Sequence, residues 1–347
     1  MVGGALAGLG WWILRSRTDI PPLSTAIAKR ERIRLLPFSI DAALQVVVVG
    51  SGASLGREGA PRQFAAALGD FGMGWLKRLS ARDRQILLAC AAGAGLGAVY
   101  AVPVGGALFT VRIMLKTWHP RALGAALITS SLAVAVASLV THNQPNLHWP
   151  NPRLSYLFVA YALVLAPLTF VAGQAFNRLM AAASRAALTG SRLLIPAIAG
   201  AGLLIGICSH WWPELPGNGK SILTATIAGG MTLSTAAAVL VLKPLVTAVF
   251  LRAGATGGML TPALATGAAA GTLFVLTINA AAGTHFGVPA MSLAGAAGVL
   301  AITQGTPFWA AIFVWELARP PIWLLLVFLT TALGAYGIRR LAERDPG

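Results

Sequence analysis

The chain has 347 residues, of which 56% are hydrophobic and only 10% are charged. Soluble domains carry about 25% charged residues, so this composition excludes a soluble globular protein and predicts an integral membrane protein. The apolar runs are long and do not alternate, which excludes a transmembrane β-barrel and favours helices. The formal net charge is +16, but the basic residues lie at the ends of apolar runs. We therefore assign them to membrane topology and lipid headgroups and expect no nucleic acid partner.

The first part of the chain reads as a series of short apolar segments. Residues 2–14 predict a short or truncated membrane helix, and a short helix to about residue 28 follows. The basic cluster at 29–34 indicates a cytoplasmic connection by the positive-inside rule. Further apolar segments are predicted at 38–50, 58–70 and 85–101, then from Pro103 through Arg112, and at 120–141.

A polar, proline-rich connector at 143–152 divides the chain into a first half, 1–142, and a second half, 153–338. The second half predicts segments at 153–184, 193–212, 221–229, 232–253, 262–278 and 288–303. A helix then restarts at Pro307, a last apolar segment covers 321–333, and a basic tail at 339–347 is expected to follow.

The two halves resemble rough repeats of each other. Each half has a break with a hydroxyl or amide side chain, at Thr18 in the first and Asn218 in the second. Each then has a glycine-rich motif that opens a helix, at 50–59 and 254–262. Each finally has a helix that starts at a proline and carries an ionisable residue, Arg112 and Glu316 respectively. Interrupted segments at corresponding places in two halves predict a binding site at the interface between the repeats.

A helix that begins inside a membrane directs its free N–H groups and its positive dipole end at one point. Several such helix starts form an anion site without a full positive charge, whereas a buried Lys or Arg would hold a halide too tightly for transport. The breaks therefore favour an anion as the ligand.

Glu58 is the carboxylate in the first glycine-rich break, and it has two interpretations. It could be structural, in an ion pair with Arg57 or in contact with a helix N-terminus. Alternatively, it occupies the anion site as a tethered anion when ionised and leaves when protonated, since ionisable residues inside a membrane are functional candidates. For Glu316, in mid-helix, we favour a buried, hydrogen-bonded structural carboxylate.

An enzyme is the least favoured class. The five histidines and two cysteines show no metal-ligand spacing, and we find no nucleophile–base pair and no cofactor motif. We therefore expect neither a metal nor a cofactor.

Several motifs in order resemble the CLC family of chloride channels and anion/proton exchangers. Gly56-Arg57-Glu58-Gly59 is similar to its glycine-arginine-glutamate-glycine-proline motif, with Ala60 in place of the proline. Residues 255–262 are similar to its second-half motif, with Leu260 in place of a phenylalanine. Residues 102–109 and 307–316 resemble the helices that follow these motifs, and Tyr336 sits where the family has a pore-lining tyrosine.

The resemblance implies an all-α membrane fold of two inverted repeats of tilted and broken helices, assembled as a homodimer in a bacterial inner membrane. It implies that Glu58 is the gate for a chloride-like anion. The anion-binding residues would be Thr18, Gly56, Arg57, Glu58, Gly59, Met259, Leu260 and Tyr336.

The departures from the family pattern concern coupling. Arg17 and Asp19 replace two glycines around Thr18, and the family's first membrane helix has no counterpart. The inner proton-relay glutamate of typical exchangers falls at Ile113, which cannot carry a proton. We therefore favour channel-like or weakly coupled transport over chloride/proton antiport. A non-transporting membrane scaffold is the hypothesis from another class.

Overall fold

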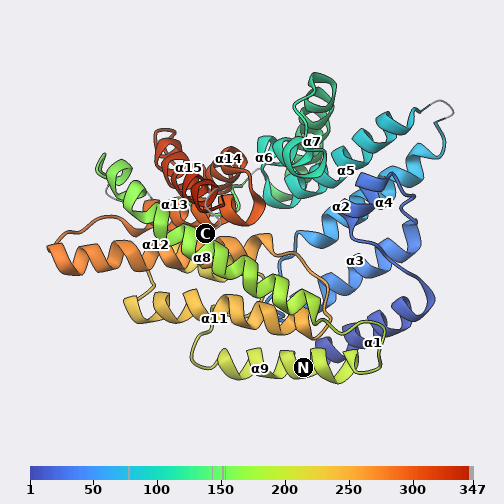
Figure 1. Cartoon of the computed structure of the whole chain (residues 1–347), viewed down its shortest axis with the longest axis horizontal. Helices are drawn as coiled ribbons and strands as arrows, with labels where there is room; N and C mark the ends of the chain where they lie inside the picture. Colours follow the sequence, from blue (N-terminus) through green and yellow to red (C-terminus); the bar gives the residue numbers. More distant parts are fainter. Residues whose placement is uncertain (77–78, 143, 151, 153, 344–347) are drawn as a thin grey trace.

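The computed structural model describes residues 1–76, 79–142, 144–150, 152 and 154–343, and within these ranges the chain is helical and contains no strand. Figure 1 shows how the helices are arranged. The helices before the connector are α1 (Val2–Arg17), α2 (Leu23–Lys29), α3 (Leu35–Gly50), α4 (Gly59–Met73), α5 (Ala81–Tyr100), α6 (Pro103–Phe109), the π-helix η1 (Thr110–Met114) and α7 (Pro120–Thr141). Those after it are α8 (Phe158–Arg185), α9 (Leu194–Cys208), α10 (Lys220–Ile227), α11 (Leu233–Arg252), α12 (Leu260–Ala282), α13 (Val288–Gln304), α14 (Pro307–Ala318) and α15 (Leu324–Ala342).

The apolar helices make this an integral membrane protein. Among the described residues, α7, α8, α11, α12 and α15 are long and apolar enough to cross a membrane. Others are too short: α10 has 8 residues, which extend about 12 Å, against a hydrocarbon core of about 30 Å. The outward face of α7 is apolar, with Ile128, Leu132 and Val136 exposed. Such side chains are suited to contact with lipid or with another protein surface in the membrane.

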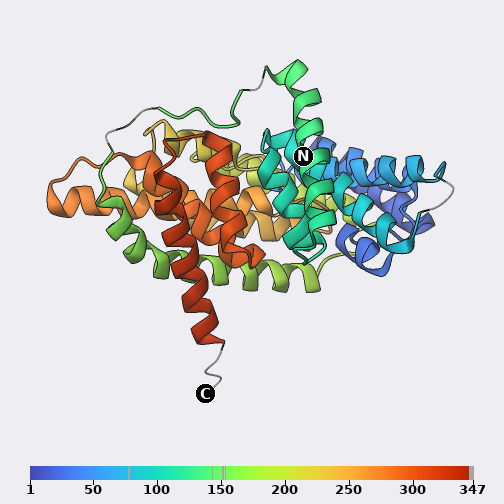
Figure 2. The ribbon, with the colours of Figure 1, turned by 90° about the horizontal axis from the view of Figure 1, so that it is seen from above.

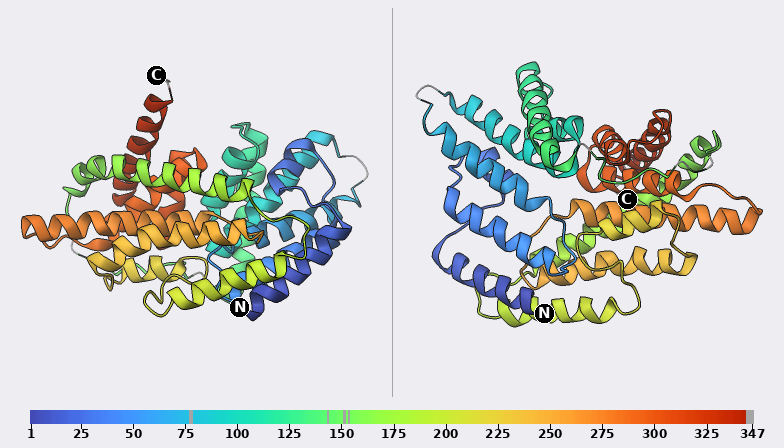
Figure 3. Two further views of the ribbon diagram at one scale, coloured as in Figure 1. Left: turned by 60° about the horizontal axis from the view of Figure 1, so that its bottom comes forward. Right: turned by 180° about the vertical axis from the view of Figure 1, so that it is seen from behind.

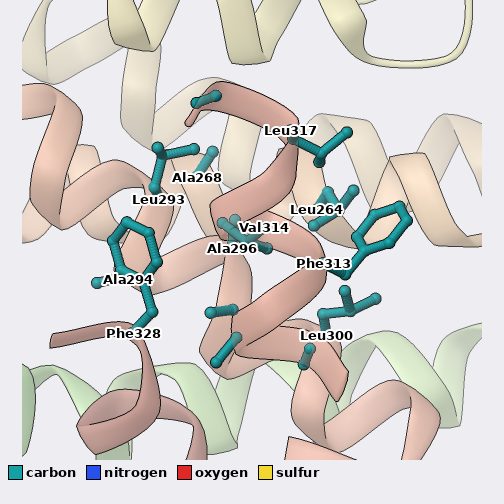
Figure 4. Close-up of a cluster of buried hydrophobic side chains, with 14 of the residues drawn as sticks. Leu264, Ala268, Leu293, Ala294, Ala296, Leu300, Phe313, Val314, Leu317 and Phe328 are labelled. Carbon is teal, nitrogen blue, oxygen red and sulfur yellow. The ribbon is translucent and has the colours of Figure 1, made fainter. Parts of the chain in front are cut away.

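The core lies between α12, α13 and α14. Figure 4 shows Leu264 of α12, Leu300 of α13 and Phe313 of α14 gathered in one cluster of buried side chains. Glycines let α12 and α13 approach closely, because a Cβ on Gly267 would collide with the Gly295 carbonyl and a Cβ on Gly271 with the Met291 carbonyl. This is the small-residue packing that membrane helices use.

Two pairs of helices, far apart in the fold, pack one predicted half against the other. Helix α1 lies against α9, where Gly4 and Gly8 leave no room for a side chain beside the carbonyls of Ile198 and Leu194 (Figure 3). Helix α6 packs on α14, and Trp309 Nε1 donates to the Gly105 carbonyl at 2.8 Å. Residues 143 and 151 of the predicted connector, and residue 153, lie outside the described ranges.

Glu316 of α14 caps the start of α6. Its Oε1 accepts from the Val104 amide at 3.1 Å and its Oε2 from the Gly105 amide, and the residue is buried. These are backbone N–H groups of a helix first turn, which have no partner within their own helix. The structure therefore has the buried, hydrogen-bonded carboxylate that the sequence predicts at this position.

The last helix is longer than the sequence predicts. The predicted segment ends at residue 333 and a tail begins at 339, but α15 continues through Gly334 and Gly337 to Ala342. Arg339 supports this last part, because it donates to the Ile302 carbonyl at 3.0 Å and pairs with Glu343 at 2.7 Å. Figure 2 shows α15 projecting from the body of the molecule towards the C-terminus. Residues 344–347 of the predicted tail lie outside the described ranges.

Candidate functional site

Two glycine-rich turns meet in the middle of the chain's fold. The Gly56 amide donates to the Gly258 carbonyl at 2.6 Å, and the Gly258 amide donates to the Gly56 carbonyl at 2.9 Å. A Cβ on either glycine would collide with the carboxylate of Glu58. Glycine at both positions therefore brings the start of α4 against the start of α12 and leaves room for one side chain between them.

That side chain is Glu58, which is fully buried. The Leu260 amide donates to Glu58 Oε1 at 2.7 Å, and Thr261 Oγ1 donates to Oε2 at 3.1 Å. Leu260 is the first residue of α12, so its N–H is one of the free donors at the positive end of the helix dipole. The carboxylate thus lies where a helix N-terminus holds an anion.

Tyr100 completes the ring of donors and was missed by the sequence analysis. Its hydroxyl lies 3.3 Å from Glu58 Oε2 and 2.5 Å from Thr261 Oγ1. The residue ends α5, and Ala101 after it turns the chain with a φ of 55°. The signal in the sequence was a tyrosine directly before the break at Val102 and Pro103, but its partner is distant in the chain.

Arg57 does not pair with Glu58 in an ion pair among the described residues. Its guanidinium lies over the Tyr100 ring, 5.7 Å from the centroid. Of the two structural contacts considered for Glu58, the structure therefore has the helix N-terminus and not the Arg57 pair.

A cavity of about 1040 Å³ reaches this site from one side. Thr18, Gly59 and Met259 of the predicted anion-binding set line it, together with Arg15, Arg17, Asp41 and Arg62. Gly59 follows Glu58 and Met259 precedes Leu260, so the cavity ends directly beside the buried carboxylate.

A second, small cavity of about 10 Å³ lies beyond Glu58, which is about the space that one water molecule needs. Tyr100, Thr261, Asn218 and Lys220 are among its lining residues, and it shares no lining residue with the large cavity. Tyr100 and Thr261 contact the Glu58 carboxylate. Glu58 and its donors therefore separate the two cavities.

Tyr336 does not join this group. It lies on α15 with its ring 5.6 Å from the Arg340 guanidinium, and it lines neither cavity. Tyr336 lies within α15, which continues as one helix past Gly334 to Ala342. Tyr100 is the tyrosine that contacts Glu58.

Ile113 lies in η1 and packs against the main apolar core. It does not line the large cavity, whereas its neighbour Met114 does. Arg112 stacks over the Trp118 ring at 4.6 Å. The position thus holds an apolar side chain in apolar surroundings.

Asp41 is a second buried carboxylate near the site. It accepts from Trp11 Nε1 at 2.7 Å and from the side-chain amides of Gln45 and Gln63, both at 2.9 Å. Asp41, Gln45 and Gln63 line the large cavity with Gly59. In the part of the chain that the structure describes, no three His, Cys, Asp or Glu residues gather as they would around a metal ion.

Comparison with known proteins finds one family across nearly the whole chain. The family model described as "Voltage gated chloride channel" matches residues 3–340. The "Voltage-gated ClC-type chloride channel ClcB" of Escherichia coli O9:H4 is 28% identical, over 99% of this chain and 84% of its own length.

Solved structures share the fold. A "slow cyanobacterial Cl-/H+ antiporter" superposes with a TM-score of 0.80 at 18% identity, over 99% of this chain and 85% of its own. A "CLC-type fluoride/proton antiporter" gives a TM-score of 0.73 at 18% identity, over 97% of this chain and 93% of its own. At this identity the likeness shows the all-helical fold that the sequence predicts.

Proposed function

This chain belongs to the voltage-gated chloride channel (CLC) family, and we propose that it carries chloride or a similar small anion across a membrane, with Glu58 as the gate. The observation that carries this proposal is the Glu58 carboxylate at the N-terminus of α12. It accepts from the Leu260 amide and the Thr261 hydroxyl, and the Tyr100 hydroxyl lies 3.3 Å away. These groups would bind a free anion equally well.

The mechanism follows from the charge of Glu58. While ionised, the carboxylate holds the anion position and separates the large cavity from the small one. Protonation removes its charge, and with it the attraction to the helix dipole and the strength of charge-assisted hydrogen bonds. The neutral side chain then leaves, and an anion from either cavity takes its place.

The large cavity would open to the cytoplasm. Leu23 of α2 lines it, and α2 leads directly into the basic cluster at 29–34, which the positive-inside rule assigns to the cytoplasm. We propose a homodimer with one anion path in each subunit. A bacterial inner membrane is the proposed location.

We favour passive, channel-like transport. Ile113 cannot carry a proton, packs against the apolar core and does not line the cavity. The E. coli relative is described as a channel, while both structural neighbours named above are described as antiporters. One observation favours proton antiport as a second candidate: Asp41 is a carboxylate that lines the same cavity as Gly59.

The test is the reversal potential of the purified protein in liposomes with a chloride gradient and a proton gradient. Passive transport predicts a potential set by chloride alone. A potential that moves with the proton gradient supports antiport. If the folded protein releases no chloride from loaded vesicles at any pH, the proposed function is overturned and the non-transporting scaffold hypothesis is supported.

A further inference from the structure

Arg62 is a cation held in place beside the gate. Its Nε donates to the Glu58 carbonyl at 2.8 Å, and its guanidinium lies over the Phe109 ring, 5.2 Å from the centroid. A backbone acceptor on one edge and an aromatic face beneath restrict the guanidinium to one orientation. The side chain is partly buried and lines the large cavity.

No carboxylate neutralises Arg62 at ion-pair distance among the described residues, where the ion pairs are Lys29–Glu31, Arg84–Asp70 and Arg339–Glu343. The two buried acids nearby have other partners. The oxygens of Glu58 are held by α12 donors and those of Asp41 by Trp11, Gln45 and Gln63. The charge of Glu58 attracts the Arg62 guanidinium through space, but a cation withdrawn from bulk water also needs a group that pairs with it directly. A mobile anion would supply that charge.

Arg15 places a second guanidinium in the same cavity. Its Nη1 donates to the Gly254 carbonyl at 2.9 Å and its Nη2 to Thr256 Oγ1 at 2.6 Å, and its guanidinium lies 5.4 Å from the Trp11 ring. It forms no ion pair with any residue in the described ranges. Two fixed cations from α1 and α4 thus face one cavity that ends at Glu58.

We propose that Arg62, assisted by the charge of Arg15, binds a small monovalent anion in the large cavity before the anion reaches the position now held by Glu58. The proposal rests on the proposed transport function and adds a residue that the motifs do not include. Planar guanidinium N–H groups suit both a halide and a planar oxyanion such as nitrate. A full charge binds more tightly than helix dipoles, but Arg62 is only partly buried and lines a large cavity, where water weakens its attraction enough for the anion to leave. Binding at Arg62 therefore sets the affinity for anions that enter from the large-cavity side.

The experiment compares Arg62→Gln with Arg252→Gln in the full-length protein. Arg252 is exposed at the end of α11, close to the cavity-lining Leu251, but does not line the cavity itself. Both variants remove one positive charge, so only the position differs. Binding of sodium chloride and sodium nitrate is measured by calorimetry in detergent, and chloride flux is measured against concentration on each side of oriented liposomes.

We expect Arg62→Gln to raise both the dissociation constant and the half-saturating concentration on the large-cavity side by about tenfold. The dissociation constant of Arg252→Gln should stay within about twofold of the wild type. That of Arg62→Lys should lie between those of the wild type and Arg62→Gln, because lysine keeps the charge but lacks the planar guanidinium N–H groups. Unchanged binding and unchanged flux in folded Arg62→Gln would overturn the proposal. If Arg62→Gln does not fold, the proposal is overturned when the dissociation constant of Arg62→Lys equals that of the wild type. If the Arg62 proposal is overturned but chloride flux still depends on Glu58, the proposed transport function is retained.

Discussion

The Leu260 amide donates to the Glu58 carboxylate at 2.7 Å across 202 positions of the chain. This contact joins the two glycine-rich breaks, because Glu58 ends the first and Leu260 begins the helix after the second. The carboxylate and a transported anion therefore compete for the same donors, since an anion can occupy the start of α12 only when the carboxylate leaves it.

Replacing Glu58 with glutamine tests this exchange. Glu58→Gln keeps the shape of the side chain and removes its charge, so the side chain no longer holds the anion position. We expect flux at neutral pH to rise about tenfold, since a hydrogen bond to a charged group contributes about 1.5–3 kcal/mol. We also expect the increase of wild-type flux with falling pH to disappear. Chloride efflux from liposomes at several pH values measures both effects.

The exposed acid Glu31 supplies the matched control for the gate. Its side chain is 43% exposed and its Lys29 pair is long, at 3.9 Å, so Glu31→Gln should leave the pH profile unchanged. A Glu58→Gln protein whose flux still follows pH as in the wild type would show that Glu58 is not the gate.

Tyr100→Phe removes one hydroxyl and keeps the ring over which Arg57 lies. The hydroxyl lies 2.5 Å from Thr261 Oγ1 and 3.3 Å from Glu58 Oε2. We expect the carboxylate to leave more easily and flux at neutral pH to rise about threefold, as one neutral hydrogen bond of about 0.5–1.5 kcal/mol would give. Tyr161→Phe is the control, because Tyr161 makes ring contacts to Phe274 and Phe286 away from both cavities. Equal flux in the two variants would leave Tyr100 without a role in closing the path.

Much of the helical frame could be predicted from the sequence. The segment predicted at 120–141 has the bounds of α7, and the helices after both glycine-rich breaks start within two residues of the predicted positions. Local signals suffice there, because glycine-rich turns and prolines interrupt one helix shortly before the next begins. The end of α15 was not predictable in this way, since Arg339 is held by a carbonyl from α13.

The pairing of Glu58 with α12 came from a family resemblance, and the remaining partners required coordinates. Tyr100 and Thr261 are 161 positions apart, and Arg15 meets Thr256 across 241. No periodicity within either segment encodes such contacts. Tyr336 was likewise placed by the resemblance alone, and in the structure its ring lies beside Arg340 and lines neither cavity.

Lys243 is a buried cation whose removal should affect stability more than transport. It is fully buried in α11, and its Nζ donates to the Leu215 carbonyl at 3.0 Å and the Gly217 carbonyl at 2.7 Å. Lys243→Met leaves both carbonyls without these donors, so we expect a loss of about 1–3 kcal/mol in unfolding free energy. Thermal unfolding in detergent measures this loss. Lys29→Met, at a side chain that is 67% exposed, should unfold as the wild type does; equal midpoints for both variants would contradict the structural role.

Glu316 provides the contrast to Glu58, because both are buried carboxylates at helix starts. Glu316 accepts from Val104 and Gly105 at the start of α6, lines neither cavity and lies in the contact between α14 and α6. Glu316→Gln keeps one acceptor oxygen and loses the charge, so we expect unfolding to become easier by about 1–2 kcal/mol. The pH profile of chloride flux should stay that of the wild type. A Glu316→Gln protein with normal thermal stability and an altered pH profile of flux would place Glu316 in the transport path. A residue can change that profile without weakening the fold only if its charge interacts with the transported anion.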